Sequence, residues 1–380
     1  MIIEQFKIAF KYIQILLIVS SLLTSCGNPK LDQPTFMAFD NIDYIKEFPV
    51  KFSLGKKTTP NIDIIGIRSF AIYDSILILN TTKEDGLWSL YSLPNHQYLN
   101  SFLKRGEGPL ELIQGPSLAS KTKITREEGQ LVAYLYDFQK GGALKFNIEE
   151  SINSKILQIS KLNTSIPPFL FEFIMIDSST FFIKEIGNMD TQQIRYLYKN
   201  GYRTTLPILD KLNQASILQG EDFNILSALT KLSDIHQKFV EMPIGLNYIN
   251  LYSLDSTLAK TICIGEKLFD ISNIQKENTW DRVYTFSDLR VFDDFFGVVF
   301  INEDIKTYQT NRTHFPSILL FNWEGEPLAE LKLENHITSF DIDFINNELY
   351  TFDVQSDEFY KYDMSTIFPE LEIHIKQSIK

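Results

Sequence analysis

The chain is poor in residues that stabilise small folds through disulfides or metals. Its 380 residues include two cysteines, five histidines and three tryptophans. Two cysteines exclude a dense disulfide framework, so the fold must be stabilised by a large hydrophobic core, which this length can supply. The histidines show no His-x-x-x-His or Glu-x-x-His spacing. A zinc site therefore has no basis in the sequence.

Basic runs and long apolar runs are also scarce. The formal net charge is −12, and no run of Lys and Arg exceeds two residues. A surface of this charge repels polyphosphate, so we expect no nucleic-acid partner. After residue 26, no segment of the sequence is apolar enough to span a bilayer. We expect a single exported domain rather than a membrane-embedded one.

The exception is a short apolar run near the N-terminus. Lys7 and Lys11 precede the stretch Tyr12–Leu23, and small residues then lead to Cys26. This order is typical of a secretory signal peptide. The ending Leu-Thr-Ser-Cys resembles the lipobox of bacterial lipoproteins, which implies cleavage before Cys26 and acylation of its thiol. An ordinary signal peptide with an incidental cysteine is the alternative.

Aromatic strands recur along the rest of the chain. Each repeat has an aromatic anchor, and a turn rich in Gly, Pro, Asn or Asp follows most of them. The anchors are Trp88–Tyr91, Ala133–Tyr136, Arg195–Tyr198, Ile249–Tyr252, Ile318–Phe321 and Phe359–Tyr362. Short strands repeating every 40–70 residues or so predict a β-propeller, here with six blades. A pair of β-sandwiches or an irregular all-β protein is the alternative.

The repeats and the leader together give a domain organisation. We expect a signal peptide over residues 1–25, a lipidated tether over 26–44 and a six-bladed propeller over 45–380. The last repeat shows only three clear strands. Its fourth strand is expected from either Phe48–Leu54 or Leu371–Ile375, which would close the ring and hide a sheet edge.

Two stretches carry a family resemblance. The run Arg105-Gly-Glu-Gly-Pro-Leu-Glu111 and the C-terminal run from Ile318 to Phe352 resemble the BF3164-like lipoproteins of Bacteroidetes. Those proteins are TolB-like six-bladed β-propellers, so the resemblance implies that fold and a place in the cell envelope. Leu110 stands where that family often has Gly. The resemblance implies no reaction, and no catalytic residue is carried over from it.

Several short stretches resemble catalytic or ligand-binding motifs but lack the residues or the neighbouring structure that those motifs require. Gly106-Glu-Gly108 lacks the third glycine and following helix of a phosphate loop, and Pro109 removes a donor. Gly115-Pro-Ser-Leu-Ala119 lacks the second glycine of a nucleophile elbow. The acid pair Asp293-Asp294 lacks calcium-loop periodicity. We therefore expect no cofactor, metal or catalytic residue.

Two functions remain open. We expect a lipid-anchored, monomeric, non-catalytic binding or scaffold module of the cell envelope, on the outer membrane rather than the inner one. The alternative is a metal-dependent hydrolase of the sugar-lactonase type, which needs acids converging on the central channel. The innermost strands offer only scattered candidates such as Asp341 and Asp343. Fold alone does not choose between these classes.

Strand direction predicts which rim binds a partner. In a four-stranded blade, the loop between strands two and three lies at the same end as the crossing to the next blade. Loops at that end are expected to bind a protein, a small molecule or a glycan, and the long loop 302–317 is expected to be dispensable for stability. The candidate residues are Lys83, Asp85, Arg105, Glu107, Glu111, Glu303, Asp304, Arg312 and His314.

Overall fold

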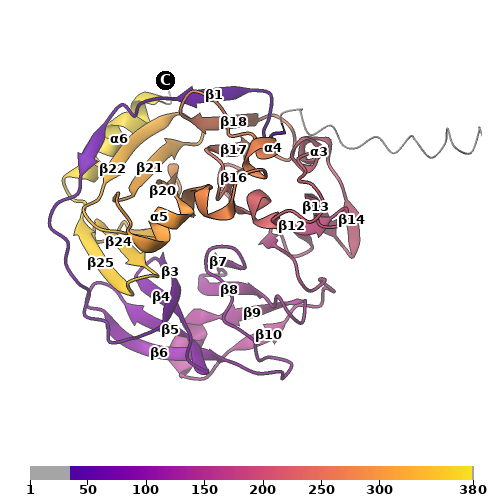
Figure 1. Ribbon diagram of the computed structural model, residues 1–380. Helices are drawn as coiled ribbons and strands as arrows, with labels where there is room; N and C mark the ends of the chain where they lie inside the picture. The colour runs from indigo at the N-terminus through magenta and orange to yellow at the C-terminus, as the bar shows by residue number, and fades with distance from the viewer. Residues whose placement is uncertain (1–34, 379–380) are drawn as a thin grey trace, which may run out of the picture.

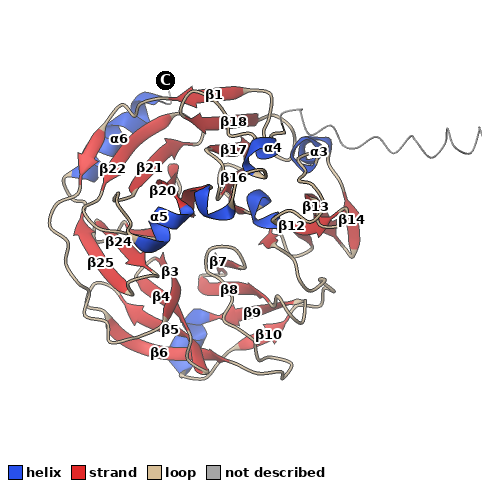
Figure 2. Ribbon diagram, viewed as in Figure 1, coloured by secondary structure: helices blue, strands red, loops and turns tan. Residues whose placement is uncertain are grey.

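The computed structural model describes residues 35–378, with side chains to Glu372. The expected signal peptide and Cys26 lie outside the described residues. Six small sheets form a closed ring around a central channel, so the protein is a six-bladed β-propeller (Figures 1 and 2). Within the described part, no helix is long and apolar enough to cross a membrane.

The blades follow each other in chain order, and each starts with its innermost strand. The innermost strands begin at intervals of 50–56 residues. Blades 1 to 3 contain β3 (Ile67–Tyr73), β4 (Ile76–Thr81), β5 (Asp85–Ser92) and β6 (Gln97–Lys104); β7 (Thr122–Glu127), β8 (Gln130–Tyr136), β9 (Ala143–Asn147) and β10 (Ile159–Lys161); β11 (Glu172–Met175), β12 (Thr180–Gly187), β13 (Gln192–Lys199) and β14 (Tyr202–Thr204).

The second half of the ring repeats this plan, with two additions from the N-terminal segment. Blades 4 to 6 contain β15 (Ala228–Ser233), β16 (Lys238–Pro243), β17 (Tyr248–Tyr252) and β18 (Ala259–Ile264); β19 (Val283–Val291), β20 (Phe295–Asp304), β21 (Ser317–Asn322) and β22 (Pro327–Lys332); β23 (Ser339–Asp343), β24 (Glu348–Asp353) and β25 (Glu358–Asp363). β1 (Ile42–Ile45) and β2 (Lys51–Ser53) join blades 4 and 5 from outside.

Short helices occupy the connections. They are α2 (Ile148–Ser154), α3 (Pro207–Asn213), η1 (Phe223–Leu226), α4 (Ile271–Ile274), η2 (Thr279–Asp281) and α5 (Ile305–Thr310), and a further helix, α6 (Ile367–Ser378), follows the last strand. α5 lies near the centre of the ring in Figure 1. It starts at Asp304, whose carboxylate accepts a hydrogen bond from the Thr307 backbone N–H at 2.8 Å, a typical N-cap.

The aromatic anchors mark the blades with one displacement. Five anchors lie on the third strand of a blade, but Ala133–Tyr136 lies on β8, the second strand of blade 2. In blade 2, therefore, one strand precedes the anchor strand, whereas two strands precede it in the other blades. The anchors pack between blades: Trp88 and Phe146, for example, are both fully buried, with ring centroids 6.0 Å apart.

The two ends of the ring carry different connections. We call one the crossing end, because it holds the blade-to-blade crossings and the loops between second and third strands. The other is the hairpin end, which holds tight turns such as Asp74-Ser75 and Asn200-Gly201. Asp74, Asn200 and Gly201 all adopt positive φ, a conformation that Asp, Asn and Gly tolerate best.

The N-terminal segment, residues 35–58, forms a belt around half of the ring. β1 pairs in parallel with β18, β2 pairs in parallel with β22, and Thr58 bridges Lys361 on β25 (Figure 1). The expected fourth strand of blade 6 therefore does not form. Residues 51–53 join blade 5 instead, and residues 371–375 belong to helix α6. Residues 36–44, expected in the tether, already lie against blade 4, with Met37 and Phe39 buried.

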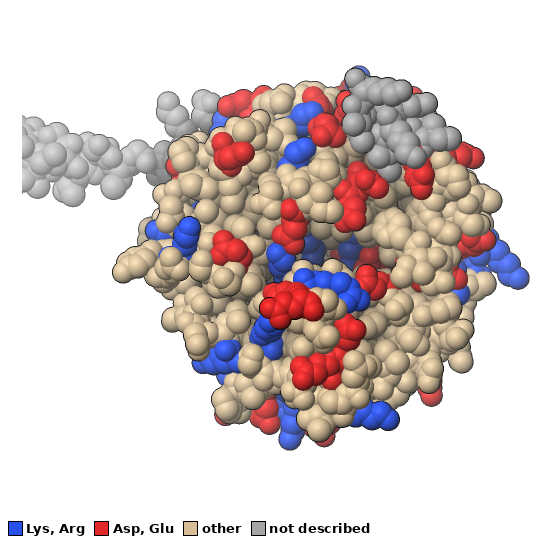
Figure 3. Space-filling model, turned by 180° about the vertical axis from the view of Figure 1, so that it is seen from behind, with Lys and Arg blue, Asp and Glu red and all other residues tan. Residues whose placement is uncertain are grey.

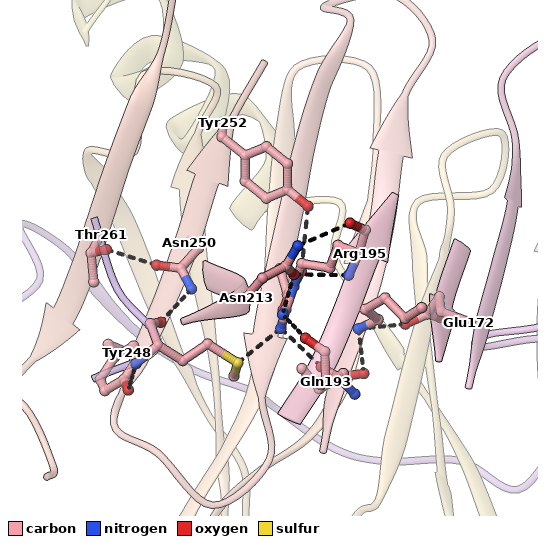
Figure 4. A network of polar contacts seen from close by, with 12 residues as sticks. Glu172, Gln193, Arg195, Asn213, Tyr248, Asn250, Tyr252 and Thr261 are labelled. Carbon is pink, nitrogen blue, oxygen red and sulfur yellow. Dashed lines mark hydrogen bonds and ion pairs between the residues drawn. The ribbon is translucent and has the colours of Figure 1, made fainter. Parts of the chain in front are cut away.

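A buried polar network holds the start of the belt (Figure 4). The Met37 backbone N–H donates to the Tyr248 hydroxyl at 3.1 Å, and its carbonyl accepts from Asn250 at 2.9 Å. The Met37 sulfur accepts a hydrogen bond from Arg195 at 2.8 Å. Because these groups are satisfied by one another, the belt closes the crevice between blades 3 and 4.

The same crevice contains a fully buried ion pair. Arg195 on β13 and Glu241 on β16 are both inaccessible to solvent, and Arg195 Nε donates to both Glu241 oxygens at 2.9 and 3.0 Å. Burial alone would raise the pKa of Glu241, but the charges of Arg195 and Lys184, together with hydrogen bonds from Arg195 and Tyr252, outweigh burial and hold that pKa below its ordinary value. Cys263 on β18 is also buried, and burial raises the pKa of its thiol to about 11.

Candidate functional site

The central channel contains a cavity at the crossing end, of about 630 Å³. Its walls come from the starts of the innermost strands β3, β19 and β23 and from η1 and α5. Its polar lining consists mostly of hydroxyls and amides: Ser69, Ser117, Asn224, Ser227, Ser287, Gln309, Thr338, Ser339 and Gln355. The volume and the mixed lining are those of a small-molecule site.

Two tyrosines and one serine add further features to this cavity. Tyr284 and Tyr308 line the wall, with ring centroids 4.9 Å apart. The Ser287 hydroxyl is buried and has no hydrogen-bond partner among the described residues. Buried polar atoms are normally satisfied, so an unpaired one in a cavity wall is a candidate contact for a ligand.

The charged residues of this cavity differ in their pairing. Arg282 is ion-paired with Asp222 at 2.9 Å, and Arg290 with Asp288 at 2.9 Å. Arg68 on β3 is exposed to the cavity and makes no ion pair within the described part of the chain. It is the charge that an incoming ligand would meet without displacing a partner.

The floor of the cavity is a segment of the crossing from blade 1 to blade 2. Ser117 and Ala119 line the crossing-end cavity, whereas Leu118 lines a cavity on the other side. Lys231, on β15 of the opposite half of the ring, donates to the Leu118 carbonyl at 3.3 Å. Gly115 permits the approach: a Cβ there would fall 2.1 Å from the Asn80 oxygen. The crossing thus divides the channel.

Arg290 completes this division. Its Nη2 donates to the Phe70 carbonyl at 2.9 Å, and its Nη1 lies 3.3 Å from Asp341. These contacts join β19, β23 and β3, the innermost strands of blades 5, 6 and 1. Burial raises the pKa of Asp341, and the Arg290 charge opposes this shift. The network connects the last blade to the first across the ring closure.

A second cavity opens at the hairpin end, with a volume of about 600 Å³. Figure 3 views the molecule from this side and shows a hollow at its centre with basic and acidic side chains around it. Lys231 lines this hairpin-end cavity and also a side pocket of about 150 Å³. Burial, and then the charge of Arg290, lower the pKa of Lys231 to about 8.

The candidates on blade 1 lie at the crossing end but outside its cavity. Lys83, Asp85, Arg105 and Glu107 are exposed, and the Arg105 backbone N–H donates to the Glu84 carbonyl at 2.9 Å. Glu111 accepts a hydrogen bond from the Gly108 N–H at 3.0 Å. This loop is therefore a structured crossing between blades 1 and 2.

The candidates on the 302–317 loop are mostly occupied by contacts within the protein. Arg312 makes a bidentate pair with Asp353 at 2.6 and 2.9 Å. Glu303 is buried and accepts hydrogen bonds from Thr313, and Asp304 caps α5. Only His314 is largely exposed, with its ring 3.4 Å from Glu303. The structure does not bring these residues together with the blade 1 candidates at the cavity.

The acids proposed for a channel metal are also occupied. Asp341 accepts from the Ile72 N–H at 2.8 Å and pairs with Arg290. Asp343 accepts from the Ile345 and Asn346 N–H groups at 3.0 and 3.1 Å in a tight turn. In the described part of the chain, no three His, Cys, Asp or Glu side chains lie close enough to hold a metal together.

Comparisons with known proteins give the fold's neighbours. No protein-family model matches the chain, and no curated protein does. A duf4221 family member from Bacteroides vulgatus is similar over 84% of this chain and 96% of its own, with 11% identity and a TM-score of 0.49.

Two further solved structures are similar at a lower level. A Bacteroides fragilis protein, described as a presumed exported protein, covers 85% of this chain and 99% of its own, with 10% identity and a TM-score of 0.43. Raptor from Chaetomium thermophilum covers 84% of this chain and 29% of its own, with 10% identity and a TM-score of 0.39. The chemistry of the site rests on this chain's own residues.

Proposed function

We propose that this chain is a lipid-anchored propeller of the cell envelope that binds a small glycan in the crossing-end cavity, and that this glycan carries an acidic sugar. The observation that carries the proposal is the unpaired guanidinium of Arg68 in a cavity otherwise lined by hydroxyls and amides. The crossing segment Ser117–Ala119 closes the cavity below, so a ligand enters from one side only.

The polar lining favours a ligand with many hydroxyl groups. Serine and threonine hydroxyls and side-chain amides both donate and accept hydrogen bonds, as sugar hydroxyls do. Tyr284 and Tyr308 also line the cavity, and aromatic side chains can pack against the apolar face of a sugar ring. A volume of about 630 Å³ falls within the 300–1,000 Å³ or so typical of ligand sites.

The charge distribution favours one acidic group on that ligand. Arg282 and Arg290 are already neutralised by Asp222 and Asp288, whereas Arg68 has no such partner among the described residues. A guanidinium matches the two oxygens of a carboxylate in bidentate geometry. A uronic acid residue would place such a carboxylate beside the ring hydroxyls.

A direct binding experiment tests this proposal. We expect an acidic oligosaccharide containing glucuronate to bind more tightly than its neutral glucose counterpart in calorimetric titrations. Replacing Arg68 by Gln should weaken the acidic ligand about tenfold or more, because hydrogen bonds to charged groups contribute about 1.5–3 kcal/mol. The neutral ligand should be unaffected.

Arg105 provides the matched control. It is an exposed arginine at the same end of blade 1 but outside the cavity, so Arg105→Gln should leave both affinities unchanged. A larger loss from Arg105→Gln than from Arg68→Gln would place the binding site on the outer rim instead. Hydrolysis of a sugar lactone, assayed with and without divalent cations, tests the alternative enzymatic function.

The anchor is part of the same proposal. The Leu-Thr-Ser-Cys sequence and the resemblance to BF3164-like, TolB-like lipoproteins support acylation of Cys26 and an outer-membrane location. Eight residues, 27–34, separate Cys26 from Thr35, whose backbone N–H donates to Asp270 at 2.9 Å. Cys26→Ala should abolish incorporation of a labelled fatty acid and release the protein from membranes, since stable anchoring needs acyl chains. An unacylated mature terminus in the wild type would contradict this part.

A further inference from the structure

The hairpin-end cavity has a chemistry that the proposed glycan site does not use. Lys231 lies at its inner end and also lines the adjoining side pocket. Its ammonium makes one hydrogen bond, to the Leu118 carbonyl at 3.3 Å, and no ion pair within the described part of the chain. Lysines that are nearly buried are usually paired. The Lys231 ammonium faces two cavities, and it has three N–H donors, of which one is used within the described part of the chain.

The other wall of the cavity is apolar and partly exposed. Phe344 is 49% and Ile345 65% exposed at the hairpin end. Phe344 packs against Phe292, with ring centroids 5.3 Å apart, and both line the cavity. Large apolar side chains left open beside a cavity are a common sign of a site for an apolar group. The cavity therefore pairs an amine with an apolar wall.

The electrostatic surroundings of Lys231 disfavour its charged form. Burial has the largest effect, and Arg290 adds a like charge, while Glu172, Asp288 and Asp341 oppose them. Glu172 and Asp341 are themselves engaged by Lys184 and Arg290. With its pKa near 8, about one Lys231 side chain in ten is neutral at pH 7, against roughly one in 3,000 for an ordinary lysine.

We propose that the hairpin-end cavity binds a small carbonyl compound, an aldehyde or ketone with an apolar body, and that Lys231 captures it as an imine. The nitrogen lone pair attacks the carbonyl carbon, and the carbonyl oxygen takes up a proton as the C–N bond forms. The nitrogen then loses its remaining proton, the C–O bond breaks, and one water molecule leaves as the C=N bond forms. No oxidant or reductant takes part.

Two other lysines provide matched controls for this reactivity. Lys123 lines the same side pocket but is ion-paired with Asp234 at 2.8 Å. Lys121 also has its pKa lowered by burial, but its ammonium contacts the Phe171 carbonyl at 3.4 Å and it lines none of the three channel cavities. Lys123 shares the location of Lys231, and Lys121 shares the direction of its pKa shift. Neither lysine combines the two properties.

Reductive trapping tests the proposal. The full-length protein is incubated at pH 7 with benzaldehyde and sodium cyanoborohydride, and modified lysines are quantified by peptide mass spectrometry. We expect Lys231 to be benzylated at least ten times faster than Lys121 and Lys123, and Lys231→Met to lose that modification alone. Labelling of Lys231 at or below the rate of Lys123 would overturn the proposal.

A second variant separates binding from simple nucleophilicity without altering the lysine. Phe344→Ser removes part of the apolar wall at the partly exposed rim of the cavity. It should slow benzylation of Lys231 severalfold while leaving its methylation by formaldehyde unchanged, because formaldehyde has no apolar body. Equal rates of benzylation in wild type and variant would show that the cavity binds no apolar carbonyl compound. This outcome is independent of glycan binding at the other end.

Discussion

Two cations, the buried Arg195 and the half-buried Lys231, occupy opposite kinds of environment in this propeller. Arg195 lies in a closed crevice between blades 3 and 4, where Glu241, Gln193 and Met37 use its donors. Lys231 lies in the channel, where a single carbonyl accepts from it at 3.3 Å. A charge that is removed from water needs a partner in a low-dielectric interior. Arg195 has that partner and holds the fold together, whereas Lys231 lacks one and remains available for chemistry.

Removing the carboxylate beside Arg195 should have the largest effect. Glu241→Gln leaves a buried guanidinium without its counter-charge, so we expect the free energy of unfolding to fall by about 3–5 kcal/mol, measured by chemical denaturation. The double variant Glu241→Gln, Arg195→Met should recover part of this loss, because no charge then remains buried. Two additive losses would show that the pair is not coupled.

Replacing Lys231 should raise the free energy of unfolding at pH 7 instead of lowering it. Because its pKa in the folded state is lowered to about 8, the penalty on folding is fully present below pH 8, where Lys231 is protonated in both states; above pH 8 the unfolded chain binds more protons, so stability rises with pH. This penalty disappears as the pH rises toward the ordinary lysine value. We expect Lys231→Met to be more stable than wild type at pH 7, on the order of 1 kcal/mol, and to lose this advantage by pH 10. Destabilisation at pH 7 would mean that the ammonium is structurally required.

The 302–317 loop adds a third case, of intermediate size. Arg312 is paired with the buried Asp353, so Arg312→Ala should lower the free energy of unfolding by about 1–3 kcal/mol through the unsatisfied carboxylate. Arg105→Gln, at an exposed arginine of the same end, should change it by less than about 0.5 kcal/mol. We therefore predict that the loop contributes to stability, contrary to the expectation from its length. Equal thermal midpoints for the two variants would restore that expectation.

The smallest expected effect concerns the reactivity of the buried, uncharged Cys263 thiol. The Cys263 thiol is inaccessible, and burial raises its pKa to about 11. Because the thiolate is the reactive form, a thiol reagent should label it slowly at pH 8 in the native protein and rapidly in denaturant. Rapid native labelling would show that the crevice around blade 4 opens in solution.

The sequence predicts the blades better than the channel. Aromatic and β-branched residues alternate along each blade strand, and this pattern depends on local burial that any single strand reveals. Blade 2 is displaced by one strand because Ala133–Tyr136 has the same pattern on a second strand as other anchors have on a third. The sequence predicts the three strands of the last blade itself, but the fourth strand that it also predicts does not form. Residues 51–53 pair with blade 5 and Thr58 bridges Lys361, and such contacts across the whole chain are not visible in a local pattern.

The channel residues were missed for a different reason. Lys231 and Arg290 alternate with apolar neighbours, as solvent-facing residues of any strand do, but an innermost strand turns that face toward the axis. In the sequence, the crossing segment Gly115–Ala119 resembles an incomplete nucleophile elbow. In the structure, this segment forms the floor of the crossing-end cavity. A local pattern distinguishes inside from outside, and it does not distinguish open water from a channel.

The belt has a consequence for how the protein is made. Residues 35–58 are synthesised before the blades that they contact: Phe39 pairs with Thr261, 222 residues later, and Thr58 with Lys361, 303 residues later. Contacts of such sequence separation form slowly because a long loop must close before they are gained. The belt therefore cannot dock until blades 4 to 6 have been synthesised, and until it docks the outer edges of β18 and β22 remain open to pairing with other chains.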